Sequence, residues 1–161
     1  MINGVHHISL STTDLDQLLA FYRDLLGLSQ RHVSQLWENY EPFETVVGMK
    51  DTRGRAASLR AGNVQLEFFH YTNPVPKAVE VRPACDGGIR HIAFDVTDIM
   101  SEYRRLLDAG VEFISEPQYL KAGVCSVYAR DPDGNIVELQ EIFDGSSVER
   151  VPFPPRATDI G

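Results

Sequence analysis

Two histidines and two glutamates of this chain are of the types that hold a metal ion, and they recur as a repeated His…Glu pair. His7 and His91 each lie in an apolar run, and Glu67 and Glu138 each interrupt a later one. Two neutral imidazoles and two carboxylates give two nitrogen and two oxygen ligands. This set suits a divalent ion of borderline hardness, namely Ni, Co, Zn, Mn or Fe. We therefore expect one divalent metal ion, held by all four residues.

An internal repeat places each pair in the same context. Asp14 follows His7 by seven residues, and Asp98 follows His91 by seven. An amphipathic segment then runs to a glycine in each copy, to Gly27 in the first and to Gly110 in the second. Internal repeats of this kind indicate a fold built from two similar modules.

The alternation of side chains along a strand agrees with a shared site. Successive side chains point to opposite faces of a strand. His7 therefore lies opposite Ile8 and Leu10, which also favours His7 over His6 as the ligand. The other three candidates likewise lie on the less apolar face: His91 opposes Ile92 and Phe94, Glu67 opposes Leu66 and Phe68, and Glu138 opposes Val137 and Leu139.

Hydrophobic periodicity and turn residues predict the elements that carry these residues. In the first copy we expect a strand over 5–11, a helix with Asp14 as N-cap that ends at Gly27, and a hairpin of 56–59 and 64–69 around Gly62-Asn63. In the second we expect a strand over 89–96, a helix over 98–109, a short strand over 111–114, and a hairpin of 124–129 and 136–142.

These elements predict an α+β fold of two βαβββ modules. Paired, the modules form one curved, mixed, eight-stranded sheet with helices on the outer face and a cleft on the inner face. The first module covers residues 1–71, a linker 72–88, the second module 89–143 and an extended tail 144–161. The domain as a whole spans about residues 4–143.

The two copies differ in length, and the difference indicates a binding loop. His7 and Glu67 are 60 residues apart, whereas His91 and Glu138 are 47 apart. Most of the 13 extra residues lie in 29–55, which carries large aromatics together with Pro42 and Gly48. We expect this segment to be an irregular loop over the cleft that shapes substrate specificity.

Composition narrows the class of partner. A formal charge of −8 and a pI near 5.0 argue against nucleic acid, which requires a basic surface. No signal peptide or membrane span is predicted, so we expect no membrane partner. Cys85 and Cys125 do not form a disulfide framework and indicate free thiols in the cytoplasm.

The motifs that carry these residues resemble the vicinal oxygen chelate superfamily, which includes glyoxalase I, methylmalonyl-CoA epimerase, extradiol dioxygenases, fosfomycin-resistance thiol transferases and bleomycin-binding proteins. The resemblance covers about residues 4–143. It rests on His7-Ile8-Ser9-Leu10, Asp14-Leu15, Phe21-Tyr22-Arg23-Asp24-Leu25-Leu26-Gly27-Leu28, His91-Ile92-Ala93-Phe94 and Arg130-Asp131-Pro132-Asp133-Gly134-Asn135-Ile136-Val137-Glu138-Leu139.

The number of ligands in the resembling families favours proton transfer. Four protein ligands are typical of the glyoxalase I and epimerase types, which implies an isomerase, epimerase or lyase that acts next to a carbonyl through a metal-bound enediolate. Glu138 is then the catalytic base, and Glu67 acts on the other side of the substrate. The positions that serve glutathione in bacterial glyoxalase I hold Ser11 and Tyr71 here, which favours a different 2-oxo or 2-acyl substrate.

The same resemblance implies a small-molecule substrate with two neighbouring oxygens. Its pocket would draw on aromatic residues that could equally be core or dimer-contact residues: Trp37, Phe43, Phe69 and Tyr119, with Tyr40 and Met49 nearby. We expect a homodimer, with the site formed within one chain or across a swapped pair. Two alternatives stay open, a ring-cleaving extradiol-type dioxygenase and a non-catalytic binding protein for a drug or hydrophobic metabolite.

Overall fold

The computed structural model describes residues 1–78 and 80–153, and for residues 33 and 34 it describes the backbone alone. The chain divides into two units. One comprises the described part of residues 1–79 with Pro152 and Phe153, and the other comprises residues 80–151. No helix in the described part of the chain is long and apolar enough to cross a membrane.

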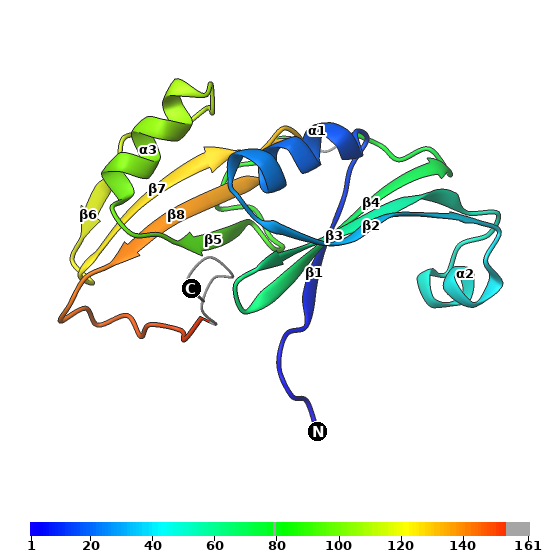
Figure 1. Cartoon of the computed structure of the whole chain (residues 1–161), viewed down its shortest axis with the longest axis horizontal. Coiled ribbons are helices and arrows are strands. Elements are labelled where there is room, and N and C mark those ends of the chain that lie inside the picture. Colours follow the sequence, from blue (N-terminus) through cyan, green and yellow to red (C-terminus); the bar gives the residue numbers. More distant parts are fainter. Residues whose placement is uncertain (79, 154–161) are drawn as a thin grey trace, which may run out of the picture. The chain divides into compact units, whose positions relative to one another are not determined.

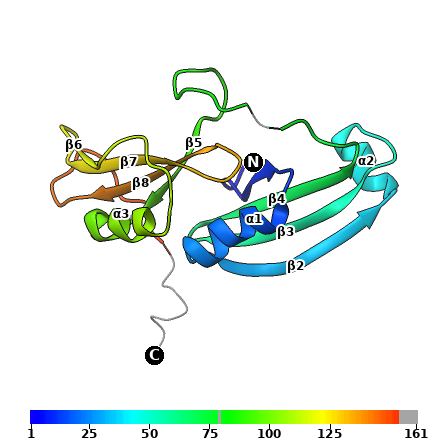
Figure 2. The same ribbon diagram turned by 90° about the horizontal axis from the view of Figure 1, so that it is seen from above.

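The first unit is a four-stranded mixed sheet with a helix on one face (Figures 1 and 2). The strand order is β1-β4-β3-β2, with β1 parallel to β4 and the other pairs antiparallel. Its elements are β1 (His7–Ser11), α1 (Leu15–Leu19), the π-helical continuation η1 (Ala20–Leu25), β2 (Ser29–Glu38), α2 (Glu41–Val47), β3 (Arg53–Ala61) and β4 (Val64–Asn73).

The second unit repeats this topology, with the order β5-β8-β7-β6 and with β5 parallel to β8. Its elements are β5 (His91–Asp95), α3 (Ile99–Asp108), β6 (Gln118–Leu120), β7 (Val124–Arg130) and β8 (Ile136–Ile142). The predicted α+β fold of two βαβββ modules is confirmed. The described strands form two four-stranded sheets where we expected one continuous sheet.

Helices α1 and α3 each begin just after the predicted aspartate and bury one apolar side. Asp14 accepts a hydrogen bond from the backbone N–H of Gln17 at 3.0 Å, and Asp98 accepts one from Ser101 at 3.2 Å. Such caps satisfy backbone donors that the first helical turn leaves free. The buried side chains lie between helix and sheet: Leu15, Leu18, Tyr22, Leu66 and Phe68 in the first unit, and Ile99, Leu106, Val127, Val137 and Leu139 in the second.

The expectation of an irregular loop over residues 29–55 is wrong. The segment forms strand β2 and helix α2. Register shifts between Gln30 and Gln35 disturb the period-two pattern of β2, so its apolar alternation is hidden. Pro42 lies in the first turn of α2, where no N–H is needed, and Gly48 caps its end with a φ of 67°.

Two smaller expectations also need correction. The predicted strand over 111–114 contributes a single bridge, between Phe113 and Ala129. The strand that pairs with β7 on the side away from β8 is β6, which lies further along the chain. The first helix changes to a π-helix at Ala20, where we expected a regular helix to Gly27. Of the predicted tail, residues 144–153 lie outside the helices and strands, and 154–161 lie outside the described residues.

Candidate metal and substrate site

The first candidate pair, His7 and Glu67, lies on neighbouring parallel strands of the first unit. Glu67 is in register with Ser9, two residues after His7, so both side chains extend from the same face of the sheet. Nε2 of His7 lies 3.6 Å from Oε2 of Glu67. The alternating burial of β1 confirms the predicted strand faces, since Ile8 and Leu10 are covered and His7 is exposed.

The second pair, His91 and Glu138, has the same register in the second unit. Glu138 pairs with Ala93, two residues after His91, and the Nε2 to Oε2 distance is 3.1 Å. Glu138 is more enclosed than Glu67, with 11% of its side chain exposed compared with 34%. Tyr128 contributes to this enclosure, because it pairs with Glu138 across β7 and its ring centroid lies 5.3 Å from that of His91.

The spacing within each pair fits two ligands of one ion. Metal–nitrogen and metal–oxygen bonds of about 2.1 Å put two adjacent ligand atoms roughly 3.0 Å apart at a right angle and roughly 3.4 Å apart at a tetrahedral angle. The measured distances of 3.6 and 3.1 Å are close to these values. Among the described residues, no three histidine, cysteine or acidic side chains form a group that could hold a metal. Each unit thus presents a pair.

Two further side chains hold members of these pairs. The hydroxyl of Ser126 donates a hydrogen bond to Oε1 of Glu138. In the first unit, Nδ1 of His6 lies 2.9 Å from Nδ1 of His7, and Nε2 of His6 lies 3.2 Å from the amide of Gln65. The contacts of His6 and Ser126 are each made to the atom of His7 or Glu138 that points away from the other member of its pair. Hydrogen bonds from residues outside a metal site orient its ligands in this way.

The sequence interpretation missed Ser126, although strand parity could have identified it. Ser126 lies two residues before Tyr128 on β7 and therefore shares the face on which Glu138 lies. The corresponding position on β3 is Ala56, two residues before the Ser58 that pairs with Glu67. The repeat thus places a hydrogen-bond donor beside one glutamate and a small apolar residue beside the other.

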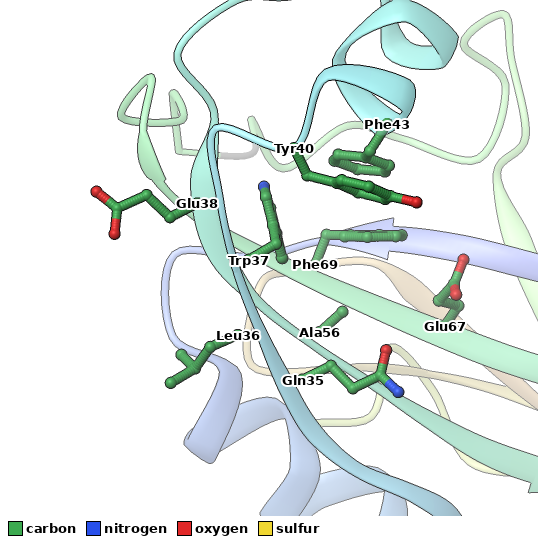
Figure 3. A pocket seen from close by; sticks show the side chains of 9 residues that line it. All are labelled: Gln35, Leu36, Trp37, Glu38, Tyr40, Phe43, Ala56, Glu67 and Phe69. Atoms are coloured by element: carbon green, nitrogen blue, oxygen red, sulfur yellow. The ribbon is translucent and has the colours of Figure 1, made fainter.

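A pocket of about 550 Å³ lies beside the first pair, in the first unit. Figure 3 shows its lining, with the aromatic rings gathered together and Glu67 at the edge of this group. The lining residues come from β2, α2, β3, β4 and the turn between β2 and α2: Gln35, Leu36, Trp37, Glu38, Tyr40, Phe43, Ala56, Glu67 and Phe69.

The pocket contains three of the four predicted substrate-binding residues. Trp37, Phe43 and Phe69 line it, and Tyr40 does too. Tyr119 lies on β6 in the second unit, where it is 73% exposed and stacks on Phe143 at 5.8 Å. Sequence reasoning did not identify Gln35, because the expected loop gave no strand faces for residues 29–55. It also missed Ala56, although Ala56 begins the predicted strand 56–59 and pairs with Phe69.

The aromatic wall is a packed cluster. The rings of Phe43 and Phe69 stack at 5.8 Å with an interplanar angle of 19°, and Tyr71 stacks on Phe69 at 5.9 Å. Trp37 packs with its edge toward all three, at centroid distances of 5.2 to 5.7 Å. Offset-stacked and edge-to-face pairs at these distances are the favourable aromatic geometries.

Close backbone approach and one buried hydroxyl fix the position of Trp37. A β-carbon at Gly54 would lie 2.6 Å from the indole ring and 2.3 Å from the carbonyl oxygen of His70, so only glycine fits there. The indole N–H donates to the hydroxyl of Thr52 at 3.3 Å. Thr52 also donates to Glu44 of α2, from its backbone N–H at 2.6 Å and from its hydroxyl at 3.1 Å.

The charge of the pocket is negative. Its ionisable lining residues are Glu38 and Glu67, and none of the nine described lining residues is a lysine or arginine. Arg53 pairs with Glu38 at 3.3 Å.

Two tyrosines near the candidate glutamates have raised pKa values. Burial, together with the nearby Glu67, raises the pKa of Tyr71 above its ordinary value of 10.0. Burial and Glu138 raise the pKa of Tyr128 in the same way, so both phenols are neutral at physiological pH.

Comparison with known proteins identifies the family. The sequence profile described as the Glyoxalase/Bleomycin resistance protein/Dioxygenase superfamily matches residues 4–139. The chain belongs to this superfamily. The same region carries both candidate pairs and the pocket, so the resemblance seen in the sequence motifs is confirmed.

Two curated relatives are epimerases. The chain is 28% identical to an ethylmalonyl-CoA/methylmalonyl-CoA epimerase of Cereibacter sphaeroides, over 88% of this chain and all of the relative. It is 30% identical to a 2-epi-5-epi-valiolone epimerase of an Actinomyces species, over 91% of this chain and 84% of the relative. A glyoxalase family protein from Bacillus cereus shares the fold, with a TM-score of 0.78 at 21% identity, over 88% of this chain and 95% of that one.

Proposed function

We propose that this protein is a metal-dependent isomerase or epimerase, or a lyase of the glyoxalase type, which moves a proton next to a carbonyl group. The observation that carries the proposal is the repeated His–Glu pair, with the same strand register in both units and ligand-like spacing. The likeness to two epimerases supports the reaction class.

In this proposal His7, Glu67, His91 and Glu138 hold one divalent ion. Each unit supplies one imidazole nitrogen and one carboxylate oxygen, so the two pairs together satisfy four positions. When bound, the ion would act as a Lewis acid on two neighbouring substrate oxygens and stabilise the negative charge that develops there. Ni, Co, Zn, Mn and Fe all suit this mixed nitrogen and oxygen set.

Glu138 is the proposed base that takes the proton from the α-carbon. The hydrogen bond from Ser126 holds Oε1 of Glu138 while Oε2 faces His91. The bond to Ser126 would keep one oxygen anchored while the other accepts the substrate proton. Low exposure limits the contact of this carboxylate with water.

Glu67 is the proposed group on the other side of the substrate. It is the one of the four proposed ligands that lines the pocket, together with Ala56 and Phe69. A carboxylate on each side of the α-carbon would let one remove a proton and the other return it, as epimerisation requires. The nonpolar wall of the pocket would orient the substrate relative to Glu67.

Solvent exchange tests the proposed reaction. The purified protein is loaded with each of the five metals and incubated in D₂O with chiral 2-hydroxy ketones and 2-acyl thioesters. Gain of deuterium at the α-carbon is the expected result. Absence of exchange across this panel, together with oxygen-dependent ring cleavage of catechols by the Fe(II) form, would show a dioxygenase instead. Absence of both reactions and of stoichiometric metal would show a binding protein.

A further inference from the structure

We propose that the substrate carries an uncharged aromatic group next to its two neighbouring oxygens, and that this group occupies the pocket against the wall formed by Trp37, Phe43 and Phe69. The inference rests on the proposed function, because it places the oxygens of the substrate beside Glu67. It goes beyond that function by naming the chemical class of the part of the substrate that is not transformed.

The shape of the pocket supports a flat group. Phe43 and Phe69 are nearly parallel, and the indole of Trp37 stands edge-on to both. Tyr40 adds a further ring, and Figure 3 shows these four rings gathered together, with Glu67 at the edge of the group. Flat aromatic groups gain specific stacking and edge contacts on such a wall, in addition to the burial of apolar area.

The size of the pocket agrees with a small aromatic compound. Its volume of about 550 Å³ lies inside the range of about 300–1,000 Å³ that is typical of small-molecule sites. Ala56 is the smallest of the lining side chains, and it pairs with Phe69 across β3 and β4, so it leaves space next to that ring. A substrate can therefore place its ring against Trp37 and its reacting carbon near the carboxylate.

The charge of the pocket argues against an anionic group at this place. Both ionisable lining residues are glutamates, and Arg53, which could attract an anion, already pairs with Glu38. Bringing a carboxylate or phosphate into this lining would cost desolvation energy without a compensating cation. The aromatic end of the substrate is therefore uncharged.

The single tryptophan of the chain provides a direct test, because Trp37 is in the pocket wall and its emission reports on the pocket alone. Three probes are titrated into metal-free protein: acetoin, 2-hydroxypropiophenone, which replaces one methyl of acetoin by phenyl, and the same ketone with a carboxylate para on its ring. We expect the phenyl ketone to bind at least tenfold more tightly than acetoin and at least tenfold more tightly than the carboxylated ketone. Equal affinity for all three probes would overturn the proposal.

A pair of variants localises the effect. Phe43→Leu keeps an apolar side chain but removes a stacking ring, and we expect it to weaken binding of the phenyl ketone at least fivefold more than it weakens binding of acetoin. Phe153→Leu is the matched control, because Phe153 lies in the same unit and contacts Gly62, away from the pocket lining. Equal weakening by both variants, or none by Phe43→Leu, would contradict the assignment.

These measurements separate the two proposals. Binding by metal-free protein requires neither the ion nor proton transfer. Preference for the phenyl ketone without deuterium exchange in any metal form would keep the aromatic pocket and reject the isomerase. Exchange on acetoin as fast as on the phenyl ketone, with equal affinities, would keep the isomerase and reject the aromatic pocket.

Discussion

The hydroxyl of Ser126 donates a hydrogen bond to Oε1 of Glu138, and the other oxygen of that carboxylate faces Nε2 of His91 at 3.1 Å. Glu138 is only 8% exposed, so water cannot easily replace the serine. Leaving a buried acceptor without its donor costs about 1–3 kcal/mol. We therefore expect Ser126→Ala to lower the free energy of unfolding by about this amount.

Denaturant unfolding of metal-free protein measures this effect without involving the reaction. Ser126→Thr is the matched control, because threonine keeps the hydroxyl, and it should lose much less stability. A midpoint for Ser126→Ala equal to that of the wild type would show that the hydrogen bond does not contribute to stability.

Loss of one imidazole should reduce metal binding. His91→Ala removes one of four proposed ligands and leaves Glu138 without its neighbour at 3.1 Å. We expect metal affinity to fall by at least tenfold, by analogy with the 10–100-fold loss that follows even from removal of outer-shell partners. Metal content after dialysis, measured by mass spectrometry, gives the answer. His32→Ala is the control, because His32 is exposed on β2 and belongs to neither pair; equal metal content in the two variants would reject the ligand assignment.

Strand parity predicted the faces of the four candidate residues correctly because the strands that carry them are regular. In β1 and β5 exposed and covered residues alternate without a break, and both pair in parallel with a strand that carries a glutamate. The hairpin turns were also predictable, since Gly62 and Gly134 adopt positive φ values of 59° and 85°.

Strand β2 and helix α2 could not be read from the sequence for a physical reason. The register of β2 against β3 shifts twice, so no simple alternation marks its two faces. Helix α2 is only seven residues long, and its Pro42 and Gly48 have the appearance of breakers although they sit at its two ends. The pocket depends on both elements, which is why its aromatic residues were predictable as a group but Gln35 of β2 was not.

Thr52 should couple the pocket wall to helix α2. It is fully buried, accepts from the indole of Trp37 and donates to Glu44. Thr52→Val has a similar shape but loses both side-chain hydrogen bonds, and we expect it to lower the free energy of unfolding by about 1–3 kcal/mol. Because Trp37 is the only tryptophan, a change in its emission in the folded variant would show that the indole has moved. Thr52→Ser keeps the hydroxyl and should retain the wild-type emission; the same emission from Thr52→Val would contradict the coupling.

The two cysteines should differ in reactivity. Cys85 is exposed, whereas Cys125 is buried, and burial together with Glu141 raises the pKa of its thiol. The raised pKa favours the protonated thiol in the folded protein. As pH rises above the ordinary thiol pKa of about 8.5, the unfolded chain forms the thiolate more readily than the folded protein does, so the free energy of unfolding falls. At pH 8, iodoacetamide should alkylate Cys85 alone in folded protein and both thiols in denaturant, as read by peptide mass spectrometry. Rapid alkylation of Cys125 in the folded state would instead indicate an accessible thiolate.

Replacement of Glu138 by glutamine should separate metal binding from proton transfer. The amide keeps one oxygen that can face the ion, and its NH2 can donate to the hydroxyl oxygen of Ser126 in place of the present bond, but it cannot take a proton from the α-carbon. General base catalysis typically contributes about 10²–10⁴-fold, so deuterium exchange on a reactive 2-hydroxy ketone should fall by about that factor at equal metal content. Glu141→Gln is the matched control on the same strand, where the glutamate accepts from the backbone N–H groups of Asp98 and Ile99. It should lose stability but retain exchange per folded molecule. Exchange retained by Glu138→Gln would show that another group, with Glu67 the first to examine, is the base.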